Sequence, residues 1–132
     1  LRGVKVGDLM ARDCPVIESR TDLQTLVEEN LLKTGQRCFM VVENDETIGM
    51  ITPHEIKNVE RRLWAFKTAA DVMKPIGEIH TVTPETSASE ALEIIGREDV
   101  NQLPVFSDGS LAGIISRDRI LRYLLTRQEL NL

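Results

Sequence analysis

An internal repeat constrains the fold of this chain more than any other feature of its sequence. A glycine in an apolar run is followed by a helix start twice, in "IGMITPHEI" and in "LAGIISRDRI". The two glycines, Gly49 and Gly113, are 64 positions apart, and the same shift places "FMVV" over "LPVF". Segments nearer the start of each copy match at shifts of 63 and 65. Because the length changes fall between elements, the pattern predicts a duplicated structural unit.

Each copy predicts the same order of elements: a helical turn, a strand, a helix, two strands and a last helix. The turns end at Met10 and Met73, and the short strands that follow are "PVI" (15–17) and "HTV" (80–82). The paired strands are almost continuously apolar, so we expect both of their faces to be buried. The last helices are expected from residue 53 to about 59 and from 117 to about 127.

Turn and cap signals support this order. Asp108-Gly109, between two apolar runs, is a strong signal for a β-hairpin. The spacing of Thr21 and Gln24, and that of Ser87 and Glu90, predicts a capping box at the start of each amphipathic helix.

The length of the chain suits one compact domain or two small units that share a core. One repeat of about 60 residues buries too little apolar surface to be robust alone. The sequence therefore predicts an α/β (α+β) fold of two pseudo-twofold-related βαββα units, 1–64 and 65–132, packed through their sheets. Trp64 and Phe66 lie in the connection between the copies, and we expect them to pin it to the body of the protein.

Composition and motifs argue against several functions. The net charge of −5 disfavours a nucleic-acid binder, because such binding requires the neutralisation of phosphates. Cys14 and Cys38 form no CxxC or Cys/His zinc pattern, so no metal site is expected. We find no nucleophile–base constellation and expect no catalytic residue. His54 and His80 are expected to be solvated.

The sequence also bears on location. No apolar stretch approaches the ~20 residues that span a bilayer, and no signal-peptide pattern is present. We therefore expect a cytoplasmic fragment without a membrane segment. The first residue is Leu rather than Met, which is typical of a piece of a longer protein.

Several stretches resemble a known family. They are "VGDLM" and "AADVM", "TVTPETSASEAL", "NQLPVF" with "LAGIIS", and the two strand-to-helix corners. In these stretches, which recur in both halves, the chain resembles a CBS-domain pair, the tandem regulatory module named after cystathionine β-synthase. In "LLKTGQRCFMVV", "IKNVERRLWAFKTAADVM" and "LLTRQEL" it also resembles the pair appended to site-2-protease-type intramembrane zinc metalloproteases. There is no HExxH motif of such a protease.

The resemblance implies a regulatory rather than a catalytic role. Such pairs commonly bind AMP, ADP, ATP or S-adenosylmethionine in the cleft between their units, form homodimers and control an attached domain. No cofactor is required for that role. The alternative is a dimerisation or docking module that keeps the fold but has lost its ligand pockets.

The resemblance also implies candidate ligand-binding residues at the corners, where the family has Ser or Thr followed three residues later by Asp. The first corner has Thr52 and Glu55, which fit either a ligand contact or a helix cap alone. The second has Ser116, with Arg119 at the Asp position, and arginine accepts no hydrogen bond. Asp118 lies one residue early, about 100° around the helix. Arg117 and Arg119, with Arg122, fit either a phosphate grip or a solvated helix face.

Further candidates come from other stretches that match family contacts. Ile17 belongs to the strand before the first helix. Val82, Thr83 and Thr86 offer backbone and hydroxyl groups to a base or ribose, although Thr83 is also an ordinary turn residue. Pro104 interrupts a strand pattern, so we expect an edge or a missing ladder donor there.

Overall fold

The computed structural model describes residues 2–132 and divides them into two compact units. The first unit is Cys14–Ile79, and the second unit combines the described residues up to Asp13 with His80–Leu132. These units do not coincide with the sequence ranges 1–64 and 65–132. Each unit contains the hairpin of one repeat and the helical turn that belongs, in sequence, to the other repeat.

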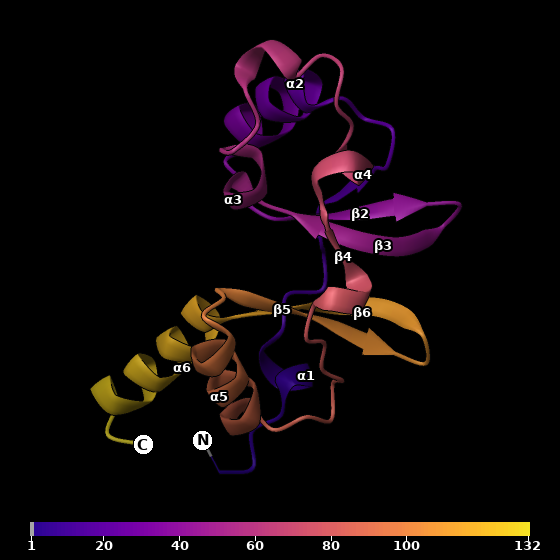
Figure 1. Cartoon of the computed structure of the whole chain (residues 1–132). Helices are drawn as coiled ribbons and strands as arrows, with labels where there is room; N and C mark the ends of the chain where they lie inside the picture. Colours follow the sequence, from indigo (N-terminus) through magenta and orange to yellow (C-terminus); the bar gives the residue numbers. More distant parts are fainter. Residues whose placement is uncertain (1) are drawn as a thin grey trace. The chain divides into compact units, whose positions relative to one another are not determined.

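The first unit contains a four-stranded sheet in the order β1-β2-β3-β4 (Figure 1). The first two strands are parallel and the other neighbours are antiparallel. Its elements are β1 (Val16–Glu18), α2 (Leu23–Thr25), the π-helix η1 (Leu26–Leu32), β2 (Phe39–Glu43), β3 (Glu46–Ile51), α3 (Pro53–Ile56), the 3₁₀-helix η2 (Arg61–Leu63), α4 (Ala69–Val72), β4 (Lys74–Pro75) and the 3₁₀-helix η3 (Ile76–Glu78).

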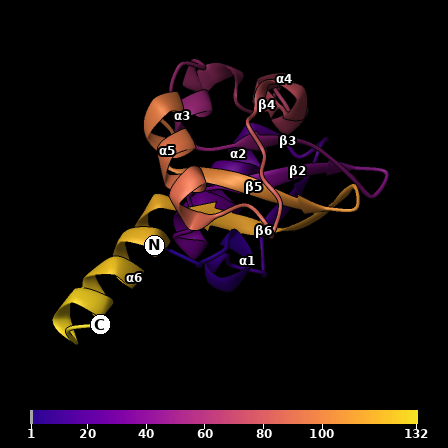
Figure 2. The ribbon, with the colours of Figure 1, turned by 90° about the horizontal axis from the view of Figure 1, so that it is seen from below.

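The second unit is built on one antiparallel hairpin. Its elements are α1 (Val6–Leu9), α5 (Ala88–Glu98), β5 (Gln102–Ser107), β6 (Ser110–Ser116) and α6 (Arg117–Glu129). Helices α5 and α6 lie on the same side of the β5–β6 hairpin in Figure 1, and Figure 2 shows the last turns of α6 extending beyond it. Together with the first unit, this arrangement confirms a mixed α+β fold of duplicated units.

The two hairpins share the position of an irregularity in their pairing. A β-bulge interrupts the register between Val41 and Val42 in one hairpin, and a second interrupts it between Val105 and Phe106 in the other. The bulges are 64 positions apart, the same spacing as the glycines. Both turns have positive φ at their two central residues, as two-residue type I′ hairpins require, so the hairpin predicted at 108–109 is confirmed.

Proline explains why the second copy loses its first strand. In the first unit, the Met40 N–H donates to the Pro15 carbonyl at 3.0 Å and extends the pairing of β1. Pro104 occupies the position 64 residues later and has no N–H. Only Val82 remains paired: its N–H donates to the Pro104 oxygen at 3.1 Å, and the Phe106 N–H donates back at 2.9 Å. The strand predicted at 80–82 is therefore a single bridge, and the missing donor expected at Pro104 is confirmed.

Each hairpin glycine provides the room into which a helical turn packs. A Cβ added to Gly49 would lie 2.7 Å from the Lys74 oxygen and would overlap Met73. A Cβ added to Gly113 would overlap the Ala11 oxygen and lie 3.1 Å from the Met10 sulfur. The methionine ending the turn of one repeat thus contacts the glycine of the other. The need for glycine is explained by this internal contact, without a ligand.

Backbone hydrogen bonds hold the exchanged turns in place. Ala11 and Ile114 exchange two N–H···O bonds of 2.9 Å, which join the end of α1 to β6. In the first unit, Ala69 N–H donates to Thr21 at 2.8 Å and Ala70 N–H donates to Ser19 at 3.0 Å, which fix α4 beside β1. Because Ala69 and Ala70 belong to the first turn of α4, these bonds satisfy N–H groups that the short helix leaves unpaired.

Both units have an aliphatic core. In the first unit the buried cluster is Ile17, Leu23, Leu26, Phe39, Val41, Ile51, Ile56 and Ala69. In the second unit it is Val6, Met10, Val82, Ala91, Ile94, Ile95, Leu103, Val105, Ile115 and Ile120. Three consecutive residues of β2 are buried, as are three of β5, which confirms the expectation that these strands are covered on both faces.

Some local predictions were wrong in detail. Asp22, not Thr21, caps the first amphipathic helix, and its carboxylate accepts from the Thr25 N–H at 2.9 Å. The cap predicted at Ser87 is confirmed, since its hydroxyl accepts from the Glu90 N–H at 3.1 Å, but the Glu90 side chain makes no return bond to complete the predicted capping box. In the connection, Trp64 packs against the core, but Phe66 is 79% exposed and pins nothing.

The glycine contacts lead to a stability prediction. Gly49→Ala should lower the free energy of unfolding by about 1–3 kcal/mol, because the added methyl group overlaps backbone and the Met73 side chain. Gly96→Ala is the matched control: it lies in α5 with no atom within 4 Å of an added Cβ, and it should stabilise by about 0.5–1 kcal/mol. Urea denaturation of both variants measures the difference. Equal effects of the two substitutions would contradict this packing account.

Candidate functional site

The first corner joins β3 to α3 and is closed by a complete capping box. The Thr52 hydroxyl accepts from the His54 N–H at 3.2 Å. The Glu55 carboxylate accepts from the Thr52 N–H at 2.7 Å and from the Thr52 hydroxyl at 2.8 Å. Pro53 occupies the first helical position, where its missing N–H costs nothing. The cap that the sequence suggested is therefore present, and one Glu55 oxygen is already engaged.

The Cys38 thiol lies near Glu55 of this corner. Cys38 precedes β2 and is partly buried. Burial, followed by the nearby Cys14 and Glu55, raises the pKa of the Cys38 thiol to about 12. The thiol is therefore neutral at physiological pH. It gives the region beside Glu55 an apolar rather than an anionic character.

Ile17, the remaining candidate in the first unit, belongs to the core. It is 8% exposed, and its side chain packs in the cluster that also contains Leu23 and Val41. Its strand, β1, is at the edge of the sheet. Any ligand contact at this position would use backbone atoms rather than the side chain.

The second corner joins β6 to α6 and is organised differently. The Ser116 hydroxyl accepts from the Arg119 N–H at 3.1 Å, so serine caps the helix as threonine does in the first corner. The Arg119 Nε–H donates to the Leu9 carbonyl oxygen at 2.9 Å. Leu9 is the last residue of α1, so the guanidinium satisfies one of the carbonyls that a helix end leaves free. Arg119 thus links the exchanged turn to the last helix.

The other charged residues of this corner face solvent. Asp118 and Arg122 form an exposed i,i+4 ion pair at 2.8 Å, which contributes little to stability. The Arg117 side chain is exposed. Arg119 and Arg122 have different partners, so these observations favour the solvated-face interpretation of the arginines over the phosphate grip.

The candidates before α5 form a closed turn. The Thr86 hydroxyl accepts from the Thr83 N–H at 3.1 Å and lies 3.3 Å from the Thr83 hydroxyl. The Thr86 carbonyl accepts from Val6 N–H of α1 at 2.8 Å. Val82 and Pro104 are buried and bonded to each other through the backbone. Within this group, the Thr83 side chain is the most exposed polar group.

Among residues 2–132, no group of three or more His, Cys, Asp or Glu side chains is arranged to hold a metal ion. No helix in that range is long and apolar enough to cross a membrane. Both histidines are exposed, as expected.

The Arg119–Leu9 bond was not predicted, because its partners are 110 residues apart and one is a backbone carbonyl.

A family model described as "CBS domain" matches the chain twice, at residues 6–61 and 69–126. The chain belongs to the CBS domain family. It is a tandem CBS pair, a regulatory type of module. The two matches follow the sequence repeats, each with its own helical turn, whereas the compact units of the structure exchange these turns.

Relatives and solved structures agree with this membership. The pair is 27% identical over 121 residues to the uncharacterized protein MJ0188 of Methanocaldococcus jannaschii, covering 90% of this chain and 43% of that protein. It is 22% identical over 122 residues to the "Putative zinc metalloprotease sll0528" of Synechocystis, covering 90% of this chain and 32% of that protein. The chain therefore spans less than half of each.

The fold matches that of CBSX2 from Arabidopsis thaliana. The structure of that protein in complex with AMP has a TM-score of 0.80 and 20% identity to this CBS pair. The match covers 94% of this chain and 98% of CBSX2. At this identity the comparison establishes the fold alone.

The second corner leads to a prediction about Arg119. Arg119→Gln should lower the free energy of unfolding by about 1 kcal/mol, because the charged donor to the Leu9 carbonyl is lost at a solvent-exposed site. Arg117→Gln is the matched control and should change stability by less than about 0.5 kcal/mol. Urea denaturation compares the two. An equal loss of unfolding free energy in both variants would show that Arg119 does not stabilise the protein by linking α1 to α6.

Proposed function

We propose that this CBS pair is a non-enzymatic regulatory module that senses an adenosine-containing nucleotide or a related small molecule and controls an attached domain. The observation that carries the proposal is the corner retained in both repeats. In each, a hydroxyl residue caps the helix that follows a glycine-containing strand. CBSX2, which shares the fold, was solved with AMP. AMP, ADP, ATP and S-adenosylmethionine are therefore the first ligands to test.

The two corners would contribute unequally. In the first, Glu55 has a carboxylate that accepts hydrogen bonds, as ribose hydroxyls require. Its present bonds to Thr52 would be replaced or shared when the ribose arrives. In the second, Arg119 offers only donors and already binds Leu9. We therefore assign the ribose contact to Glu55. Contacts to the base or ribose are assigned to the neighbourhood of Ile17 and to Val82, Thr83 and Thr86.

The attached domain is proposed from the relatives. The chain spans 32% of the Synechocystis protein, whose name describes a zinc metalloprotease. A CBS pair on such an enzyme would act from the cytoplasmic side, commonly as a homodimer. A ligand would regulate the enzyme only by binding one arrangement of the module more tightly than another.

A second candidate function, a docking module without ligand, is favoured by the bonds at both corners. Glu55 and Arg119, the two residues that depart from the family pattern, each have an internal hydrogen-bond partner. In that function they stabilise the helix starts and bind no nucleotide.

Thermal denaturation with AMP, ADP, ATP and S-adenosylmethionine tests the proposal. A ligand present at 100 times its dissociation constant should add ~2.7 kcal/mol, which corresponds to several degrees. Glu55→Gln should weaken the effective ligand about tenfold, because an amide replaces the charged acceptor. Asp71→Asn is the matched control: it weakens the equivalent capping box of α4 and should leave affinity unchanged. Unchanged melting temperatures with all four compounds would support the docking function instead.

A further inference from the structure

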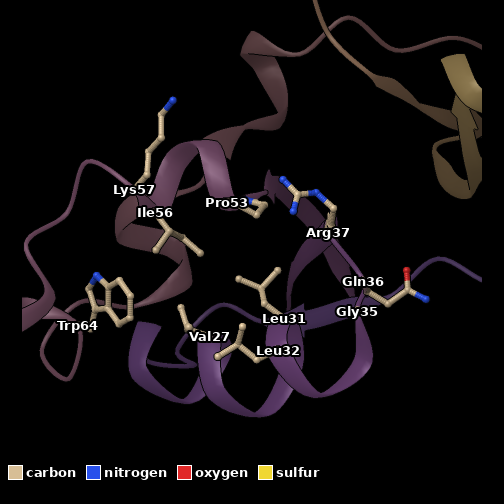
Figure 3. A pocket seen from close by; sticks show the side chains of 10 residues that line it. All are labelled: Val27, Leu31, Leu32, Gly35, Gln36, Arg37, Pro53, Ile56, Lys57 and Trp64. Atoms are coloured by element: carbon tan, nitrogen blue, oxygen red, sulfur yellow. The ribbon is translucent and has the colours of Figure 1, made fainter.

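The first unit contains a cavity that none of the candidate ligand-binding residues lines. It has a volume of about 410 Å³ and lies between η1, α3 and the connection that contains Trp64 (Figure 3). Its size is within the range of small-molecule sites, roughly 300–1,000 Å³. The residues that line it are Val27, Leu31, Leu32, Gly35, Gln36, Arg37, Pro53, Ile56, Lys57 and Trp64.

The repeat explains why the cavity exists. In the second unit α6 continues for 13 residues, and Leu124 from its third turn packs against the core cluster. In the first unit α3 ends at Ile56 after 4 residues, and the chain leaves towards Trp64. The position 64 residues before Leu124 is Glu60, which is exposed. The first copy therefore has no leucine at the position whose side chain packs against the core in the second copy.

Trp64 forms one end of the cavity and is held there. Its indole N–H donates to the Val59 carbonyl at 3.0 Å, and its ring packs against the core. Val27 and Leu31 face the cavity from η1, and Ile56 faces it from α3 (Figure 3). The walls are thus a rigid indole and branched aliphatic side chains, which suit an apolar ligand body. Leu32 at the rim is 74% exposed.

The charge of the lining has one sign. Arg37 lies at the end of the cavity opposite Trp64, and Lys57 extends from α3 at the rim with its amine directed outward (Figure 3). No acidic residue lines the cavity, although the whole chain has a net charge of −5. Neither Arg37 nor Lys57 has an ion-pair partner within residues 2–132. The cavity therefore combines apolar walls with a cation at one end, which complements an amphiphilic anion.

We propose that this cavity binds a carboxylate with an apolar alkyl tail, the tail lying against Trp64 and the carboxylate at Arg37. The site is separate from the nucleotide corner, although α3 contributes to both: Thr52 caps the helix, and Pro53 and Ile56 line the cavity. The proposal does not depend on nucleotide binding.

Trp64 is the only tryptophan of the chain and reports binding directly. Titration of the purified chain with decanoate, below its micelle concentration, should change the Trp64 fluorescence along a saturable 1:1 curve. Decanol and decylammonium have the same tail without the negative charge. Each should bind at least about fivefold more weakly, since a charge-assisted bond contributes about 1 kcal/mol more than its neutral equivalent at such an exposed site.

Variants assign the selectivity to Arg37. Arg37→Gln should remove the preference for decanoate over decanol and leave decanol binding unchanged. Arg97→Gln, an exposed arginine at the end of α5 in the second unit, is the matched control and should keep the preference. Both side chains are on the surface, so both variants should fold.

Three results would overturn the proposal. One is a fluorescence response that fails to saturate. Another is equal binding of decanoate, decanol and decylammonium, which would leave only a non-specific apolar surface. The third is a loss of the response as protein concentration rises, together with dimer formation in sedimentation experiments. That result would show that a second copy of the chain covers the cavity.

Discussion

The contact between a hairpin glycine and the helical turn of the other repeat joins the two repeats of this CBS pair. Gly113 leaves room for Met10 and Ala11, and Gly49 leaves room for Met73. A larger residue at either position would overlap backbone at the end of the turn and force it to shift. Because the contact occurs in both copies, neither repeat is structurally complete within its own stretch of sequence. Each compact unit therefore contains residues from both repeats.

This interlacing gives the two corners different tasks. Arg119 stands where the family pattern has an acidic residue, and it binds the carbonyl of Leu9 at the end of the exchanged turn α1. A carboxylate there could not donate such a bond. Glu55, at the equivalent position of the first corner, accepts from Thr52 and caps its own helix. The first corner thus has a carboxylate that caps its own helix, and the second has a guanidinium that links two helices.

Local patterns explain how much could be predicted from the sequence. The repeat, the hairpin at 108–109, the cap at Ser87 and the effect of Pro104 each depend on residues close together in the chain or on a fixed shift between copies, and all are present in the structure. The exchange of turns could not be predicted, because the sequence pattern of each turn is compatible with packing on either hairpin. The short α3, and with it the cavity beside Trp64, was missed because the helical pattern continued beyond Ile56. The choice of Asp22 over Thr21 as a cap depends on a one-residue difference in where the chain turns.

Hydrogen exchange in the intact chain tests the interlacing most directly. Ile95→Ala removes a buried side chain of the second unit that belongs to neither exchanged turn, and it should destabilise that unit by about 2–5 kcal/mol. The account predicts that amides of α1 and Ala11 lose protection together with α5, β5 and β6, whereas those of α4 and β4 keep the protection of the first unit. The opposite result, with 69–75 losing protection and 6–11 retaining it, would show that each repeat folds with its own turn and would contradict the central claim.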